Sequence, residues 1–155
     1  INTFEFAEEN NQQFAGRILY ALGVRAVRPL IEVLRRAEKM RVRKNALTLL
    51  QAVGKESLSD IVSELQRPQN PWYLIRNLVL LLGELGDKEV CNFLTPTLAH
   101  PDVRVRRETV KALAKIGGEK AVSLLIRCLY DRDLLVRKAT VVALGDLGEA
   151  KAVPD

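Results

Sequence analysis

Five glycines recur along the chain at an almost constant spacing, and this regularity constrains the fold more than any other feature. Gly23, Gly54, Gly86, Gly117 and Gly148 are separated by steps of 31, 32, 31 and 31 residues. Self-similarity at a fixed period of about this size is typical of stacked-repeat proteins, in which each unit packs on its neighbours. A glycine just after a helix adopts the left-handed conformation without strain. The spacing therefore predicts a helix end at each glycine.

The two most similar copies end at Gly117 and Gly148, and they read VRVRRETVKALAKIGG and LLVRKATVVALGDLGE. In this register Leu113 aligns with Leu144, and apolar residues recur three or four positions apart. That periodicity places the apolar residues on one stripe of an α-helix. A shorter apolar segment, AVSLLIRCLYD, lies between the copies. Each repeat is therefore expected to be a helical hairpin that cannot bury its apolar stripe alone.

The same register predicts an all-α protein of about four to five hairpins. Proline removes one backbone hydrogen bond, so Pro29 and Pro96 are each expected to bend a shorter helix. The repeats are expected at approximately 1–23, 24–54, 55–86, 87–117 and 118–148, with the start of another at 149–155. The helix pairs are expected at Val24–Ala37 with Val42–Val53, Ser57–Gln66 with Trp72–Leu85, Lys88–Ala99 with Val103–Ile116, and Glu119–Tyr130 with Leu134–Leu147.

The two ends of the chain suggest a single repeat domain, 1–155, that is part of a longer protein. The sequence begins without Met, and Glu149 to Val153 predicts the opening of another short helix. So short a segment cannot cover the apolar side of the last repeat, and stacked repeats ordinarily end in a unit with a polar outer face. The parent chain is therefore expected to continue beyond Asp155.

Composition and charge favour a soluble, cytoplasmic protein. With 48% hydrophobic and 28% charged residues the chain suits a packed domain, and its net charge is +5. No apolar run approaches the roughly 18 residues that cross a bilayer, and the N-terminus lacks the order of a signal peptide. Cys91 and Cys128 form no CxxC pair, so two buried thiols are expected rather than a metal site or a disulfide. His100, the only histidine, is expected to be structural.

The hairpins AVSLLIRCLYDRDLLVRKATVVALGDLG and VCNFLTPTLAHPDVRVRRETVKALAKIGG resemble HEAT repeats, in particular the short bacterial form also found in the phycobilisome lyases. The resemblance covers the chain from about Val24 to Gly148. It implies a right-handed α-α superhelix, with the first helix of each hairpin on the convex side and the second on the concave side. It is specific for the fold and not for a function.

The resemblance also implies a polar ladder, formed by an Asp in the turn and an Arg on the second helix. Asp102 with Arg106, and Asp133 with Arg137, match that pattern. The spacing also suits an Asp that caps the helix and meets an Arg one turn on. The ladder is expected to be broken in the earlier repeats, where the same two columns hold Lys39 and Arg43 in one repeat and Pro71 and Ile75 in the other.

A column of basic residues is the main candidate for a binding site. Such a column is either a solvated face with local carboxylate partners, such as Glu108, Glu84 and Asp146, or a site for an acidic or phosphate-bearing partner. Trp72 and Tyr73 are expected to pack between helices, with an exposed aromatic anchor as the alternative. The column and its flanking residues are Lys44, Arg76, Arg107 and Lys138, with Arg41, Arg104 and Lys111.

Catalytic motifs are missing from the sequence, which contains no Gly-rich phosphate loop, serine elbow, HExxH or paired cysteines. Among HEAT-like enzymes, the deoxyhypusine hydroxylases carry His-Glu pairs, which this sequence lacks. The expectation is therefore a non-catalytic protein–protein interaction scaffold that needs no cofactor or metal and presents a concave helical surface, with an acidic partner as one candidate. The alternatives are a nucleic-acid-binding module that uses the basic column, or a subunit like the bilin lyases.

Overall fold

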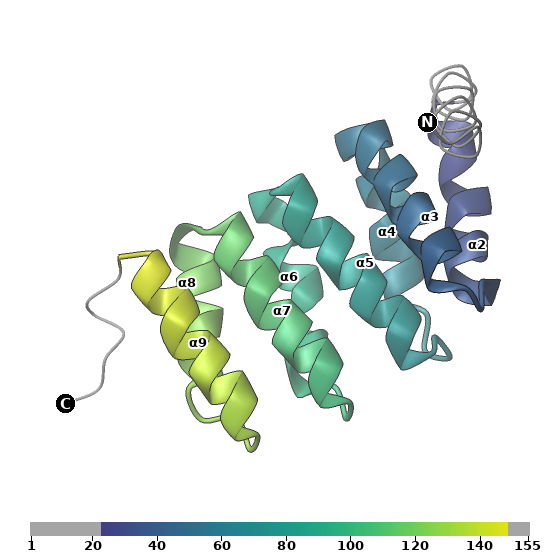
Figure 1. Ribbon diagram of the computed structural model, residues 1–155. Coiled ribbons are helices and arrows are strands. Elements are labelled where there is room, and N and C mark those ends of the chain that lie inside the picture. The colour runs from purple at the N-terminus through teal and green to yellow at the C-terminus, as the bar shows by residue number, and fades with distance from the viewer. Residues whose placement is uncertain (1–22, 149–155) are drawn as a thin grey trace, which may run out of the picture. The chain divides into compact units, whose positions relative to one another are not determined.

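The computed structural model describes residues 23–148, and all regular structure in this range is helical (Figure 1). The chain divides into two compact units, residues 1–60 and 61–155, with the boundary inside α4 (Leu58–Leu65). The predicted first repeat before Gly23 and the predicted short helix at 149–155 lie outside the described residues. The organisation as one repeat domain stays a prediction.

The described part of the first unit contains a helical hairpin whose second helix ends at Gly54. α2 packs against α3, and Ile31, Leu34 and Leu50 are buried between them. Pro29 is the third residue of α2, where a backbone N–H would have no acceptor in the helix, and the turn just before α2 is 3-10 rather than α. The described elements are η1 (Gly23–Ala26), α2 (Val27–Arg36), α3 (Met40–Val53), η2 (Gly54–Ser57) and the start of α4.

The second unit is built in two layers. Figure 1 shows α5, α7 and α9 side by side in one layer, with α6 and α8 in the other. One column of the longer helices, Leu82, Leu113 and Leu144, is buried in the core, as the repeat register predicts. The elements after α4 are α5 (Trp72–Leu85), η3 (Lys88–Val90), α6 (Cys91–Leu94), η4 (Pro96–Ala99), α7 (Val103–Ile116), α8 (Gly118–Cys128) and α9 (Leu134–Asp146).

Glycine is required where these helices end. Gly86 closes α5 with φ 64° and ψ 25°, the left-handed conformation that the spacing predicts. Gly117 lies between α7 and α8 with φ 65° and ψ −169°, a region that is essentially restricted to glycine. The backbone amides of both glycines donate to a carbonyl four residues upstream, Leu82 and Leu113 respectively. The glycine column therefore fixes where each long helix stops.

The bounds of α5 and α7 agree with the predicted ones, but the predicted single helix at Lys88–Ala99 is wrong. Three short pieces occupy this range, and only the middle one, α6, is α-helical. Pro96 begins the last piece and cannot donate a backbone hydrogen bond, so the α-helix ends at Leu94. The Asp87 side chain accepts from the Glu89 amide and caps the first piece, η3.

Candidate interaction surface

Two aspartates cap second helices, as the sequence spacing predicts. The Asp102 carboxylate accepts from the Arg104 amide at 2.8 Å, and Asp133 accepts from two amides at the start of α9 at 2.8 and 3.3 Å. The predicted arginine partner of Asp102 is wrong, because Asp102 forms its ion pair with Arg104 at 2.7 Å and not with Arg106. The side-chain hydrogen bond from Arg104 lowers the pKa of Asp102 to about 2.

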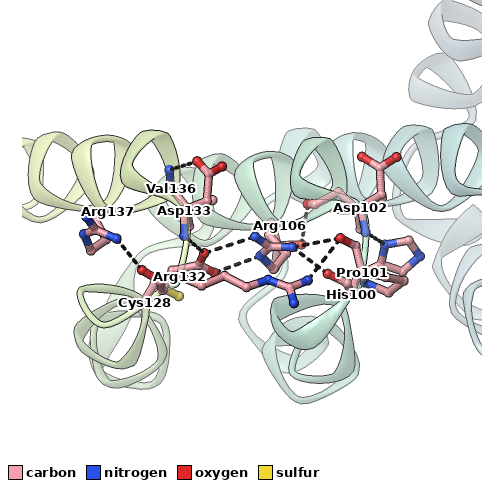
Figure 2. A network of polar contacts seen from close by, with 12 residues as sticks. His100, Pro101, Asp102, Arg106, Cys128, Arg132, Asp133, Val136 and Arg137 are labelled. Carbon is pink, nitrogen blue, oxygen red and sulfur yellow. Dashed lines mark hydrogen bonds and ion pairs between the residues drawn. The ribbon is translucent and has the colours of Figure 1, made fainter.

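Arg106 connects two successive repeats instead. Figure 2 shows its guanidinium between the turn before α7 and the turn before α9. Nε and Nη2 donate to the two carboxylate oxygens of Asp131 at 2.9 and 3.1 Å, while Nη1 donates to the carbonyls of His100 and Pro101 at 2.9 and 3.1 Å. The Arg106 residue is only 4% exposed. A bidentate, buried pair of this kind fixes both side chains in one geometry.

The pKa of Asp131 responds to two opposing effects at this contact. Burial alone raises the pKa of this carboxyl group. Hydrogen bonds from Arg106 and from the Asp133 amide, together with the positive charge of Arg106, outweigh burial and hold the pKa below its usual value. Asp131 is therefore ionised at neutral pH, and its contact with Arg106 is an ion pair.

A second contact of the ladder column was not predicted at all. Arg43, Arg106 and Arg137 each donate Nη1 to a backbone carbonyl six residues upstream, at 2.7, 2.9 and 2.8 Å. In the repeat where Ile75 occupies the column, the side-chain amide of Asn70 donates to a carbonyl six residues upstream at 2.5 Å. These carbonyls follow or end the preceding helix, where intrahelical donors run out. The recurrence of arginine at this position could have predicted the contact with a backbone carbonyl, because Arg43 makes it without any aspartate in its turn.

The aromatic pair at the start of α5 is half-buried. The rings of Trp72 and Tyr73 meet edge to face, with centroids 6.0 Å apart and planes at 87°. The Arg104 guanidinium, from α7, lies 3.4 Å from the centroid of the Trp72 ring and also binds Asp102. Two partners thus hold Arg104, and its contact with the Trp72 ring joins α5 to α7. The packing of Trp72 and Tyr73 between helices and the alternative of an aromatic anchor both stay predictions.

The basic column differs from helix to helix. Lys44 is exposed on α3, which belongs to the first unit. In the second unit, Arg76 of α5 donates through Nε to Glu108 of α7 at 3.0 Å, while Lys138 of α9 is exposed. Arg107 of α7 is half-buried, and its Nε is fully buried with no hydrogen-bond partner among the described residues. The column therefore splits into one arginine with a carboxylate partner and basic residues without one.

Other cations beside the column follow the same division. Lys115 of α7 forms an ion pair with Glu84 of α5, as the solvated-face interpretation anticipates for Glu84. Lys111 of α7 is exposed and forms no ion pair with any described residue. On the described part of α5, α7 and α9, the cations without a carboxylate partner are Arg107, Lys111, Lys138 and Arg137, of which Arg137 donates to the backbone carbonyl of Asp131.

The thiols and the histidine show no reactive arrangement among the described residues. Cys91 and Cys128 are both buried and free, as predicted. Burial raises the pKa of both thiols, that of Cys128 to about 11, so neither is a thiolate at neutral pH. His100 accepts the Asp102 amide through Nδ1 at 3.0 Å and thereby shapes the turn before α7. The described residues contain no group of three or more His, Cys, Asp or Glu side chains able to hold a metal ion.

Helical hairpins that recur at a fixed period and contact the next repeat, as Arg106 contacts Asp131, are typical of helical-repeat proteins. A family model described as HEAT repeats matches residues 58–145, which is more than half of the 155-residue chain. The protein belongs to the HEAT repeat family, whose members commonly act as non-catalytic scaffolds for protein interaction. The all-α solenoid predicted from the glycine spacing is thereby confirmed, while the phycobilisome-lyase form stays a prediction.

No curated protein matches the chain. In the described residues no helix has the length and apolar character needed to span a bilayer.

Proposed function

We propose that this protein is a non-catalytic scaffold that binds an acidic and apolar segment of a partner protein across α5, α7 and α9. The observation that carries the proposal is the mixture of side chains on this layer. Basic side chains lie in the same repeat columns as exposed aliphatic ones: Lys111, which has no carboxylate partner, with Val142, and Arg104, which pairs with Asp102, with Leu135. Val142 is 62% exposed and Leu135 52%. Exposed apolar side chains near basic ones suit a peptide with carboxylate and aliphatic groups.

A nucleic-acid interface is less well supported by the same side chains. Binding to a phosphate backbone depends on a series of cations that each replace a counterion. Three basic residues near this face, Arg76, Arg104 and Lys115, already have carboxylate partners in Glu108, Asp102 and Glu84. The exposed aliphatic side chains of α9 would lie against the phosphates without compensation. The geometry therefore supports a protein partner over a nucleic acid.

The test compares charge reversal on the two layers of the second unit. Lys111→Glu with Lys138→Glu alters the α5, α7 and α9 layer, and Lys120→Glu with Arg127→Glu makes the same charge change on α8. Each protein is screened against arrayed twelve-residue peptides that are acidic and apolar, acidic only, or basic and apolar. We expect the wild type and the α8 variant to retain acidic and apolar peptides, and the first variant to lose them.

Equal retention of the acidic and apolar peptides by both double variants would show that the α5, α7 and α9 layer is not the binding face. Binding of labelled single-stranded or duplex oligonucleotides by the wild type, more tightly than any peptide and with an affinity that falls steeply with salt, would favour the nucleic-acid alternative.

A further inference from the structure

The contact between Arg76 and Glu108 shows what an arginine of the basic column requires. The Nε of Arg76, on α5, donates to Oε2 of Glu108, on α7, across 32 residues at 3.0 Å. Glu108 is only 8% exposed, so its carboxylate is largely removed from water and held by this arginine. Charge-assisted hydrogen bonds of this geometry are stronger than neutral ones.

The next repeat carries the arginine but not the carboxylate. Arg107 occupies the position of Arg76 one repeat on, and the position 32 residues after Arg107 is Ala139, on α9. A methyl group therefore stands where the preceding repeat has a carboxylate. Consistent with this substitution, the Nε of Arg107 is buried and without a hydrogen-bond partner among the described residues. An unsatisfied buried donor, above all one on a charged group, is unfavourable.

We propose that Arg107 is a binding site for the carboxylate of an aspartate or glutamate side chain in the partner. This inference rests on the proposed function and assigns one position of the partner segment. The incoming carboxylate would bind the guanidinium of the half-buried Arg107, and a turn of this side chain would bring the buried Nε to a carboxylate oxygen, as the Nε of Arg76 donates to Glu108 in the preceding repeat. Lys111, one turn further along α7, and Lys138, in the same column on α9, are exposed and strengthen the positive potential around the site.

A carboxylate fits this site better than a phosphate does. The repeat itself provides the template, because the arginine one repeat back takes one carboxylate oxygen at Nε. A phosphate carries more charge and more acceptor oxygens, and its recognition favours several guanidinium groups that converge. In the described part of the column only Arg107 is an arginine without a carboxylate partner.

The experiment installs the carboxylate that the repeat lacks. Ala139→Glu should supply Arg107 with an internal partner and occlude the site, so that an acidic peptide binds about 10- to 100-fold more weakly. Ser123→Glu, at an exposed position of α8, makes the same charge change in the other layer and should leave the affinity unchanged. Glu108→Gln, made in the otherwise wild-type protein, should remove the carboxylate partner of Arg76. The Nε–H of Arg76 should then respond to an acidic peptide as well.

The readout is the Nε–H signal of each arginine in a proton–nitrogen correlation spectrum, assigned with Arg107→Lys. Titration with hexaglutamate should move the Arg107 signal saturably in the wild type and in Ser123→Glu, and should leave it unmoved in Ala139→Glu. Inorganic phosphate and hexalysine serve as the comparison probes.

Three results would overturn the inference. If hexaglutamate binds but leaves the Arg107 Nε–H signal in place, the site is wrong while the proposed scaffold function stands. If inorganic phosphate moves that signal at lower concentration than hexaglutamate does, the carboxylate assignment is wrong. If no acidic peptide binds the wild type or the Ser123→Glu control, the proposed function is lost together with the site.

Discussion

The close approach of α5 and α7 at Gly83 leads to a prediction with an internal control. A Cβ atom added at Gly83 would lie 2.7 Å from the Cα and 2.8 Å from the Cβ of Ala112. The first of these is a backbone atom of a packed helix, so the two helices must separate to admit the methyl group. Overpacking costs about 1–3 kcal/mol, and a clash with backbone belongs to the upper half of this range, about 2–3 kcal/mol, of which the higher helix propensity of alanine offsets about 0.8–1 kcal/mol. Gly83→Ala should therefore destabilise the protein by about 1–2 kcal/mol.

Gly145 occupies the same repeat column on α9 and reverses the expectation. Nothing among the described residues lies within 4 Å of a Cβ built there. Gly145→Ala should therefore keep the full gain in helix propensity of about 0.8–1 kcal/mol and stabilise the protein. The same chemical change at two equivalent positions is thus predicted to have opposite signs.

Thermal unfolding followed by far-UV circular dichroism measures both variants. For a chain of this size about 1 kcal/mol corresponds to a shift of about 2–4 °C in Tm. Gly83→Ala should lower Tm by about 2–8 °C, and Gly145→Ala should raise it by about 2–4 °C. If Gly83→Ala leaves Tm unchanged or raises it, the packing between α5 and α7 described here is incorrect.

Further predictions concern the buried contact between repeats and the thiols. Arg106→Ala leaves the carboxylate of Asp131 without its partner and should cost about 3–5 kcal/mol in urea unfolding, whereas Arg104→Ala, at a side chain 55% exposed, should have a much smaller effect. Because folding lowers the pKa of Asp131, its contribution to the free energy of unfolding is fully present above the unfolded pKa of about 3.9 and is lost as pH falls through the folded pKa. Asp131→Asn should therefore remove this part of the acid dependence of unfolding. Cys91 and Cys128 should react with a thiol reagent only after unfolding, and rapid reaction of the native protein would contradict their burial and raised pKa values.

Local features of the fold were predictable because they depend on the sequence within one repeat. The ends of α5 and α7 follow from apolar periodicity, a capping or proline residue at the start, and a glycine at the end. The piece from Lys88 to Ala99 was mispredicted because one proline outweighs the apolar pattern around it. Asp102 and Asp133 were predicted as caps for the same local reason, since a cap depends on the next two or three amides.

Contacts between repeats were harder to predict, because they depend on how neighbouring helices are offset. Arg106 has two aspartates within reach, one in its own turn and one in the next repeat, and the sequence spacing favoured the wrong one. The unpartnered Nε of Arg107 follows from an alanine 32 residues on, which becomes meaningful only once the contact between Arg76 and Glu108 shows which positions face each other.

Arg106 and Arg107 are adjacent on α7, yet their environments indicate opposite roles. Successive residues of an α-helix point about 100° apart, so Arg106 enters the contact between repeats while Arg107 points elsewhere, toward the proposed binding face. Arg106 satisfies four acceptor oxygens within the protein, whereas the Nε of Arg107 satisfies none among the described residues. Arg107→Gln should therefore leave the free energy of unfolding unchanged or raise it, because it removes a buried charged donor that the fold does not use.

The same substitution should weaken the binding of acidic peptides, and Arg106→Lys should do the reverse, lowering stability while the remaining folded protein still binds. Functional residues often carry a cost in stability of this kind. Urea unfolding and peptide titration of the two variants, at a temperature where both are folded, separate the two effects. A loss of stability in Arg107→Gln comparable to that in Arg106→Lys would show that Arg107 is a structural residue, and that its buried Nε has a partner in the folded protein.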